Sequence, residues 1–199
     1  ADLQEAHPKV RVLDLPQLIA PRDVQARPVL PSVLYEPSPV EVDSQGFLPW
    51  ADQSAERESG DRDPVAGEAA RRLGAAAPGR IIRSAKSWLC HGGVNRTAKI
   101  LPWHGADDVR KRSPVEASTA LLAHLRAAWN HAHARDDEAL RLEHQTVVLT
   151  VPASFDEAAR QLTLKAAADA GLDRVTLLEE PLAAFYGFVA KTGGTRRAT

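Results

Sequence analysis

The second half of the chain has the most regular pattern of apolar and polar segments. Residues 146–151, TVVLTV, are a β-branched run without polar alternation, which is typical of a parallel strand covered on both faces. Residues 174–178 give a second apolar strand, and apolar positions at helical spacing precede, separate and follow the two strands. The order helix, strand, helix, strand, helix predicts a right-handed parallel βαβ crossover in a three-layer sandwich.

Local start and stop signals bound the helices of this half. Ser113 and Glu116 have the spacing of a capping box ahead of a long helix that ends in the charged run RDDE. Ser154 and Glu157 repeat that spacing, and Gly171 is a suitable C-terminal stop for the helix between them. The apolar stripe of that helix consists of Phe155, Ala159, Leu162, Ala166 and Ala170.

Proline-bounded apolar runs in the first half predict short strands near a sheet edge. The first is in residues 10–15, and the second is in residues 28–37, where prolines interrupt a β-like pattern. Residues 42–63 mix glycine, serine and charged side chains, which predicts an exposed loop with Phe47 and Trp50 packing inward.

A helix, a short segment and a weak strand are predicted next. Asp63 fits an N-cap and Pro64 fits the first helical position of a helix that ends before a Pro-Gly pair. Ser84 fits the cap of the short segment AKSWL, which contains Lys86. Residues 96–103 carry a weak strand pattern.

Composition narrows the class of protein. The 199 residues are 44% hydrophobic and 26% charged, as in a soluble α/β protein with one sizeable core. Lys and Arg number 25 against 26 Asp and Glu, which disfavours nucleic acid or anionic lipid as a partner. Cys90 is the single cysteine, so no internal disulfide forms, and a reducing cytoplasm is expected. No apolar run approaches the roughly 20 residues that span a bilayer. Methionine is absent, which suggests a truncated or processed N-terminus.

Candidate chemistry gathers at the carboxyl ends of the two predicted strands, where open α/β sheets bind ligands. Residues 152–154 and 179–181 are expected at this rim, with Glu180 placed to hold a cation or its waters. Arg160 is near enough to reach back to the rim, and Lys86 could contact a phosphate. Spacing alone favours a different role, in which Glu180 complements its own helix dipole and the two cations are solvated surface groups.

These segments resemble the heat-shock protein 70 family. The resemblance is carried by VVLTVPASFDEAARQLTLKAAADAGL, VTLLEEPLAAFYGF, VAGEAARRL, RSAKSWL and RPVLPSVLY. It implies a partial nucleotide-binding domain over residues 1–199, with an actin-like, ribonuclease-H-like ATPase fold whose mixed sheet is flanked by helices. Residues 28–110 would be a small-subdomain-like insertion and residues 111–199 the core βαβ region. The implied function is that of a chaperone ATPase, with ATP and Mg²⁺ as cofactors and unfolded client proteins and co-chaperones as partners.

The resemblance also implies roles for four residues. Lys86 matches the catalytic lysine that contacts phosphate, and Glu180 matches the carboxylate that helps organise Mg²⁺ and the attacking water. Pro152 and Arg160 match the pair that relays the nucleotide state to a substrate-binding domain.

The chain departs from the family pattern in three places. No segment matches either of the family's two phosphate-binding hairpins, and GGT at residues 193–195 is not a substitute because no apolar strand and Asp precede it. The expectation is therefore that this piece alone does not hydrolyse ATP. Residues 90–93, CHGG, differ from the usual continuation after the lysine and suggest a divergent bacterial branch.

Four alternatives are weighed against this interpretation. A cysteine hydrolase would pair Cys90 with a histidine and an orienting group drawn from His91, His104 and Asn95. A metal site would use His131, His133 and His144, although residues two apart on a helix point about 200° away from each other. The third alternative is a non-catalytic, chaperone-like interaction module, and a sugar kinase or actin-like relative would share the expected fold.

Overall fold

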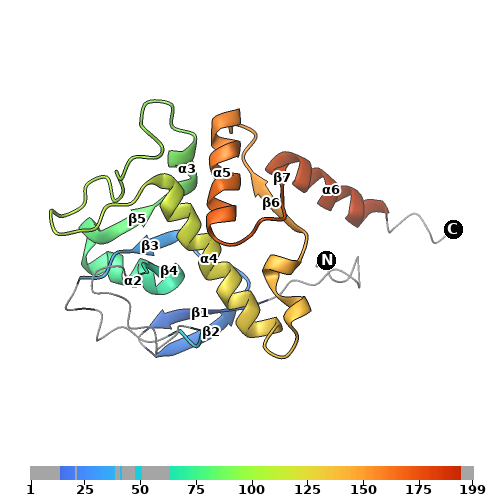
Figure 1. Ribbon diagram of the computed structural model, residues 1–199, viewed down its shortest axis with the longest axis horizontal. Helices are drawn as coiled ribbons and strands as arrows, with labels where there is room; N and C mark the ends of the chain where they lie inside the picture. Colours follow the sequence, from blue (N-terminus) through green and yellow to red (C-terminus); the bar gives the residue numbers. More distant parts are fainter. Residues whose placement is uncertain (1–13, 21, 39–40, 42–47, 51–62, 194–199) are drawn as a thin grey trace.

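The strands of the described residues form three small sheets rather than one (Figure 1). The structure is a computed structural model that describes residues 14–20, 22–38, 41, 48–50 and 63–193. The strands are β1 (Leu15–Ala20), β2 (Asp23–Arg27), β3 (Val33–Tyr35), β4 (Val65–Ala66), β5 (Ile81–Arg83), β6 (Val147–Val151) and β7 (Val175–Glu179). β1 and β2 form an antiparallel hairpin, β3 lies between β4 and β5 in an antiparallel sheet, and β6 and β7 are parallel. The predicted α/β class is confirmed.

The helices pack between and beside these sheets. They are α2 (Gly67–Ala76), α3 (Ala85–Leu89), α4 (Pro114–His133), α5 (Glu157–Asp169) and α6 (Glu180–Gly193), with 3₁₀ turns η2 (Pro78–Arg80), η3 (Glu138–Leu140) and η4 (Leu142–His144). None of the described helices combines the length and the hydropathy that a bilayer-spanning helix needs.

Helix α4 runs through the middle of the molecule and contributes to two apolar cores (Figure 1). Its buried Ala117 packs in a cluster with Leu34 and Ile82 from β3 and β5. Its buried Val115 packs in a second cluster with residues of β6 and α5. The predicted capping box starts the helix: the Ser113 hydroxyl accepts the Glu116 N–H at 3.0 Å, and the Glu116 carboxylate accepts the Ser113 N–H at 2.7 Å.

The βαβ unit of β6, α5 and β7 is confirmed. Its strands are parallel with Val151 opposite Glu179, so their carboxyl ends meet at one rim. Gly171 ends the α5 segment as predicted and has a φ of +79°, a conformation that glycine tolerates best. A Cβ at this position would also collide with the guanidinium of Arg126 on α4.

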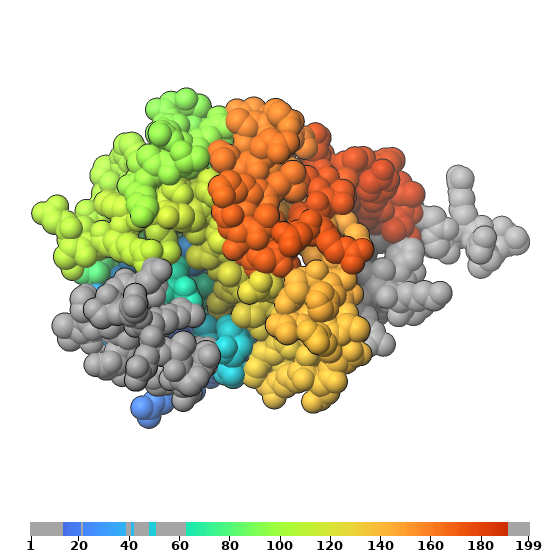
Figure 2. Space-filling model, in the orientation of Figure 1, coloured from blue at the N-terminus to red at the C-terminus, as the bar shows by residue number. Residues whose placement is uncertain are grey.

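One face of the β6–β7 pair is exposed, so the prediction of a strand covered on both faces is wrong for the described residues. Val148 is 56% exposed, and Thr150 and Thr176 are also exposed. The unbroken apolar run reflects side-chain type, but among the described residues nothing covers that face. Helix α6 adds exposed apolar side chains, and Figure 2 shows it at the edge of the molecule. These side chains are Leu182, Phe185, Tyr186, Phe188 and Val189.

The helix predicted from Asp63 and Pro64 starts later than expected. Residues Val65–Ala66 form β4 and pair with β3, so α2 begins at Gly67. Gly67 has a φ of +75°, and a Cβ there would lie 2.4 Å from the Leu30 side chain. Strand pairing and this close approach override the local capping signal.

Two predicted caps are corrected. Asp156, not Ser154, caps α5: its carboxylate accepts the Ala159 N–H at 2.7 Å, and Glu157 is the first helical residue. Ser84 does precede α3, but it has a φ of 57° and its side chain makes no cap hydrogen bond. A charged acceptor adjacent to the first turn outcompetes a serine two residues earlier.

The weak strand at residues 96–103 is absent, since only an isolated bridge joins Leu101 to Arg112. Of the early strand at residues 10–15, β1 begins at Leu15 and the rest lies outside the described residues. The same holds for Phe47 and most of the predicted loop. Trp50 packs inward as predicted, with its ring 5.4 Å from that of His124.

Candidate functional site

The four residues selected from the sequence lie at or near the rim formed by the carboxyl ends of β6 and β7. Pro152 directly follows β6, and Glu180 directly follows β7 as the first residue of α6. Arg160 is in the first part of α5, and Lys86 is in α3. Two ion pairs connect these elements.

Lys86 and Glu180 form the first ion pair, although they are 94 residues apart in the sequence. The Lys86 ammonium donates a hydrogen bond to Glu180 Oε1. The two side chains remain 53% and 44% exposed. An ion pair this exposed contributes at most about 1 kcal/mol to folding, so it is not needed to hold the fold together. Both charged groups remain within reach of a ligand from solvent.

Arg160 forms the second ion pair with Glu179, the last residue of β7, at 2.6 Å. The sequence placed Arg160 near this rim but did not identify Glu179 as its partner. Pro152 shapes the turn from β6 into α5, since its carbonyl accepts the Phe155 N–H at 3.1 Å. The ends of the two strands are therefore held by separate contacts: the Pro152 turn after β6, and the Arg160–Glu179 ion pair at the end of β7.

A third charged contact, which the sequence did not suggest, ties the loop after α3 to α5. The Arg96 guanidinium donates two hydrogen bonds, both 2.7 Å long, to the Asp156 carboxylate. Arg96 and the Ala159 N–H lower the pKa of Asp156 to about 2. This fork fixes the loop that leads away from Lys86 against the start of α5. The one available signal was an Asp immediately before a helical stripe.

The arrangement suits a phosphate together with a hydrated cation. Lys86 offers a compact positive charge with three donors, and Glu180 offers carboxylate oxygens beside it. No cluster of three or more metal-ligating side chains exists among the described residues. A divalent cation here would therefore keep most of its waters, as Mg²⁺ commonly does.

The cysteine-hydrolase alternative finds no support in the geometry. The Cys90 thiol contacts the Ser87 carbonyl at 3.2 Å rather than a histidine. The neighbouring His91 accepts a hydrogen bond from the Gly93 N–H at 3.2 Å and stacks on the Trp88 ring.

The three histidines of the metal-site alternative do not converge either. His131 contacts Arg135, His133 packs edge-on against Trp129 at 4.8 Å, and His144 contacts the Glu138 carbonyl at 2.8 Å. Each ring is thus engaged with a different neighbour.

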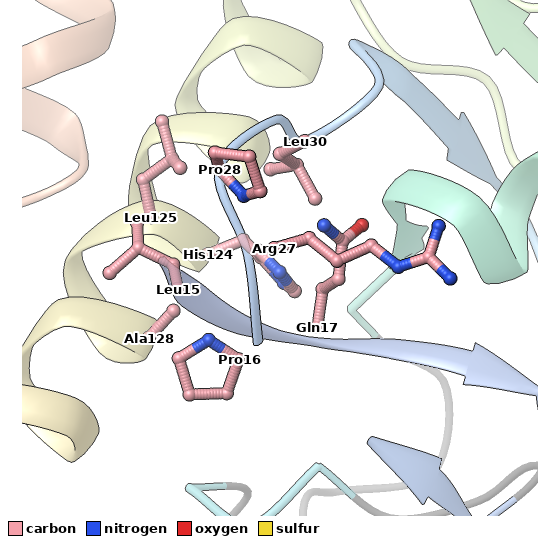
Figure 3. Close-up of a pocket in the computed structure, with 9 residues that line it drawn as sticks. All are labelled: Leu15, Pro16, Gln17, Arg27, Pro28, Leu30, His124, Leu125 and Ala128. Atoms are coloured by element: carbon pink, nitrogen blue, oxygen red, sulfur yellow. The ribbon is translucent and has the colours of Figure 1, made fainter. Parts of the chain in front are cut away.

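A small cavity lies between the β1–β2 hairpin and α4, and none of these charged pairs contributes a residue to its lining (Figure 3). Its volume is about 50 Å³, room for water but not for a nucleotide. Gln17 Oε1 and His124 Nε2 are buried without a hydrogen-bond partner among the described residues. Burial lowers the pKa of His124 to about 4, so this ring is neutral near pH 7.

Comparisons with known proteins identify the same family as the sequence motifs. The family model described as Hsp70 protein matches residues 66–196. A chaperone protein HscA homolog of Pseudomonas fluorescens (strain SBW25) is 37% identical over 171 residues, which cover 80% of this chain and 26% of that protein. A heat shock 70 kDa protein BIP3 of Oryza sativa subsp. japonica is 33% identical over 154 residues, covering 68% of this chain and 22% of that protein.

A chaperone protein HscA homolog of Azotobacter vinelandii is 38% identical over 134 residues, covering 61% of this chain and 20% of that protein. The chain therefore spans about a quarter or less of the length of these relatives. The family match extends over α2 to α6 and includes both members of the Lys86–Glu180 pair. On the strength of the family match and these relatives, the chain belongs to the Hsp70 family.

Proposed function

We propose that this chain is part of the ATP-binding domain of a chaperone ATPase, and that Lys86 and Glu180 act on ATP and Mg²⁺. The contact between Lys86 and Glu180 carries the proposal, because it joins two motifs that are 94 residues apart at the rim where α/β sheets bind ligands. Membership of the Hsp70 family adds independent support.

The side chains fit both cofactors chemically. The Lys86 ammonium would bind phosphate oxygens as a point charge, and the Glu180 carboxylate would accept hydrogen bonds from waters around Mg²⁺. Mg²⁺ would supply neutralisation of the charge that develops on the phosphate oxygens. Glu180 would orient a water for attack, while Lys86 would hold the phosphate in position for that attack.

Arg160 and Pro152 would carry the nucleotide state away from this rim. Arg160 is bonded to Glu179, the neighbour of Glu180, so a shift of Glu180 would change the position of the Arg160 guanidinium. Pro152 fixes the turn at the end of the adjacent strand. In the whole protein, this pair would face a substrate-binding domain, and unfolded clients and co-chaperones would be the partners.

The proposed fold is an actin-like, ribonuclease-H-like ATPase lobe in two parts. Residues 28–110 would form the smaller subdomain, and residues 111–199 the core βαβ region. In support, the sheet of β3, β4 and β5 and the sheet of β6 and β7 have separate apolar clusters on either side of α4. The exposed face of β6 and the apolar side chains of α6 are where further elements of such a lobe would pack.

Steady-state ATP hydrolysis by the full-length protein tests the proposal. Lys86→Ala is expected to lower kcat at least a hundredfold with a small change in KM, because the lost contact acts mainly on the transition state. Glu180→Gln, which is similar in size, should also lower kcat strongly. Lys165→Ala is the matched control, since Lys165 is exposed on α5 and, within the part of the chain that the structure describes, pairs only with Asp169.

The 199-residue chain and the full-length protein should also be compared by calorimetric titration with ATP and Mg²⁺. We expect binding and turnover in the full-length protein and none in the chain, which has no segment resembling the phosphate hairpins. If Lys86→Ala and Lys165→Ala have equal activity, or if the full-length protein does not bind ATP, the catalytic proposal is wrong and the interaction-module alternative replaces it.

A further inference from the structure

An open groove beside β5 is lined by two tryptophans. It has a volume of about 220 Å³ and is lined by Pro78, Ile81–Arg83, Trp88 and residues 101–104, which we call the tryptophan groove. The rings of Trp88 and Trp103 stack with their centroids 5.0 Å apart, and Trp103 is 50% exposed. Neither indole N–H has a hydrogen-bond partner among the described residues. Half-exposed aromatic rings with free donors are typical of binding surfaces.

One wall of this groove is an edge strand. β5 pairs with β3 on one side, and no strand of the described chain pairs with its other side. The Glu36 N–H bonds the Arg80 carbonyl at 2.9 Å, so the alternation of an antiparallel pair makes Leu34 and Ile82 the next hydrogen-bonded pair. The N–H and C=O of Arg83 therefore point away from β3. An edge of this kind accepts an extended peptide as an additional strand.

The opposite wall is held in place by several contacts. Leu101 exchanges backbone hydrogen bonds of 2.9 and 2.7 Å with Arg112, and the Lys111 ammonium bonds the Pro102 carbonyl. At the base, the Ala106 N–H bonds the Gly79 carbonyl at 3.3 Å. A groove with fixed walls loses little conformational entropy when a ligand enters, which favours binding.

The charges around the groove indicate the sign of the ligand. Arg83 is exposed and makes no ion pair with any described residue, and the groove lining contains no acidic side chain. Asp107 and Asp108 follow in the same loop, but neither lines the groove, and Asp108 pairs with Arg80. A carboxylate opposite Arg83 on an added strand would form a cross-strand ion pair.

We propose that the tryptophan groove binds an extended segment of a partner protein in which apolar and acidic residues alternate. The Ile81 N–H on the outer edge of β5 already bonds the Pro78 carbonyl, so the segment would add to this edge at Arg83. It would place apolar side chains on Trp103 and a carboxylate beside Arg83. Neighbouring side chains on a strand face opposite ways, so an alternating segment would turn its apolar face to Trp103 and its acidic face to Arg83. The groove shares helix α3 with the Lys86–Glu180 rim through Trp88, but it contains neither member of that ion pair, and its binding does not depend on the ATPase proposal.

Calorimetric titration of the 199-residue chain with a blocked seven-residue peptide of alternating valine and glutamate tests the proposal. We expect saturable binding that Arg83→Glu and Trp103→Ala each weaken at least tenfold. Arg72→Glu is the charge-matched control, because Arg72 is exposed on α2 and does not line the groove, and it should weaken binding less than twofold. The valine–lysine analogue of the peptide should bind at least tenfold more weakly.

A second titration tests the backbone contacts without altering the protein. The same peptide with every valine N-methylated, or with every glutamate N-methylated, loses the donors on one of its two edges. We expect one of these two methylated peptides to lose binding. Because this titration uses the unaltered protein, it tests the proposal even if a protein variant does not fold. Equal binding of both methylated peptides would overturn strand addition.

Other outcomes would overturn the proposal altogether. These are no binding at millimolar peptide, equal weakening by Arg83→Glu and Arg72→Glu, or tighter binding of single-stranded oligothymidylate than of the acidic peptide. The last result would mean that the rings stack on bases and Arg83 contacts phosphates, so the groove would be a nucleic-acid site.

Discussion

Two of the ion pairs that join distant parts of this chain, Glu36–Arg112 and Lys86–Glu180, differ in burial. Glu36 and Arg112 are 76 residues apart, with side chains only 4% and 10% exposed, and a second hydrogen bond of 3.4 Å supports the pair. Lys86 and Glu180 are 94 residues apart and about half exposed. Removing one partner of a buried pair leaves an uncompensated charge, whereas an exposed charge is stabilised by water. The buried pair is thus structural, and the exposed pair is available for a ligand.

Breaking the buried pair should have the largest effect on stability. Arg112→Met leaves the Glu36 carboxylate buried without its partner, and we expect the free energy of unfolding to fall by about 3–5 kcal/mol. Denaturant unfolding followed by circular dichroism measures this loss. The double variant Glu36→Gln, Arg112→Met should be more stable than Arg112→Met alone, because no charge is left buried. If the double variant loses more than the single one, the contact is not the cause.

His124 is a second buried group that tests the comparison, because its Nε2 is buried and no described residue hydrogen-bonds it. The pKa is lowered from 6.5 to about 4 by burial, so the unfolded chain takes up a proton at a higher pH than the folded protein does. The free energy of unfolding is therefore unaffected by this group above about pH 6.5. As the pH falls towards 4, protonation of His124 in the unfolded chain lowers that free energy by up to about 3 kcal/mol. His124→Leu should flatten the dependence of unfolding free energy on pH in this range. An unchanged slope would contradict this assignment.

The Arg96–Asp156 fork offers an intermediate case, since its side chains are 14% and 53% exposed and it is doubly hydrogen-bonded. Arg96→Leu should raise the pKa of Asp156 from about 2 towards its ordinary value of 3.8, as followed by NMR titration of the carboxyl group. The folded-state pKa is depressed, so the stability from this group is present above about pH 3.8 and is lost as the pH falls through about 2. Arg72→Leu, at an exposed position on α2, should leave the titration unchanged.

The smallest effect on stability is expected at the exposed pair. Lys86→Ala should change the free energy of unfolding by less than about 1 kcal/mol, because the pair is screened by water. Denaturant unfolding of Lys86→Ala and of the control Lys165→Ala should give overlapping curves. A loss as large as that of Arg112→Met would show that Lys86 holds the fold together, and the reduced turnover of this variant would then need another explanation.

Local sequence patterns predicted the elements whose signals are local. The capping box of Ser113 and Glu116, the stop at Gly171 and the parallel pairing of residues 146–151 with 174–178 were all recognisable from short spacing rules. The position of Asp156 as the true cap was missed because Ser154 and Glu157 matched a familiar spacing. Neighbouring acceptors compete, and the sequence does not rank them.

Contacts between residues far apart in the chain were harder to predict from the sequence. The family resemblance gave Lys86 and Glu180 roles toward the same cofactors, but their direct contact was not predicted. The Glu36–Arg112 pair and the role of Gly67 depend on tertiary packing that leaves no local pattern. The exposure of Val148 was missed for a different reason. An apolar run shows that a strand has side chains suited to burial, but it does not show whether another element covers them.

Helix α4 has a consequence for how the molecule melts. Its first two turns supply Val115 to one apolar cluster and Ala117 to the other, so neither cluster can loosen without disturbing the same stretch of backbone. The capping box at Ser113 closes that stretch at its start. A single calorimetric transition, in which both sheets are lost together, is therefore expected on heating. Cooperativity between the groove beside β5 and the rim of β6 and β7 would come from this shared helix.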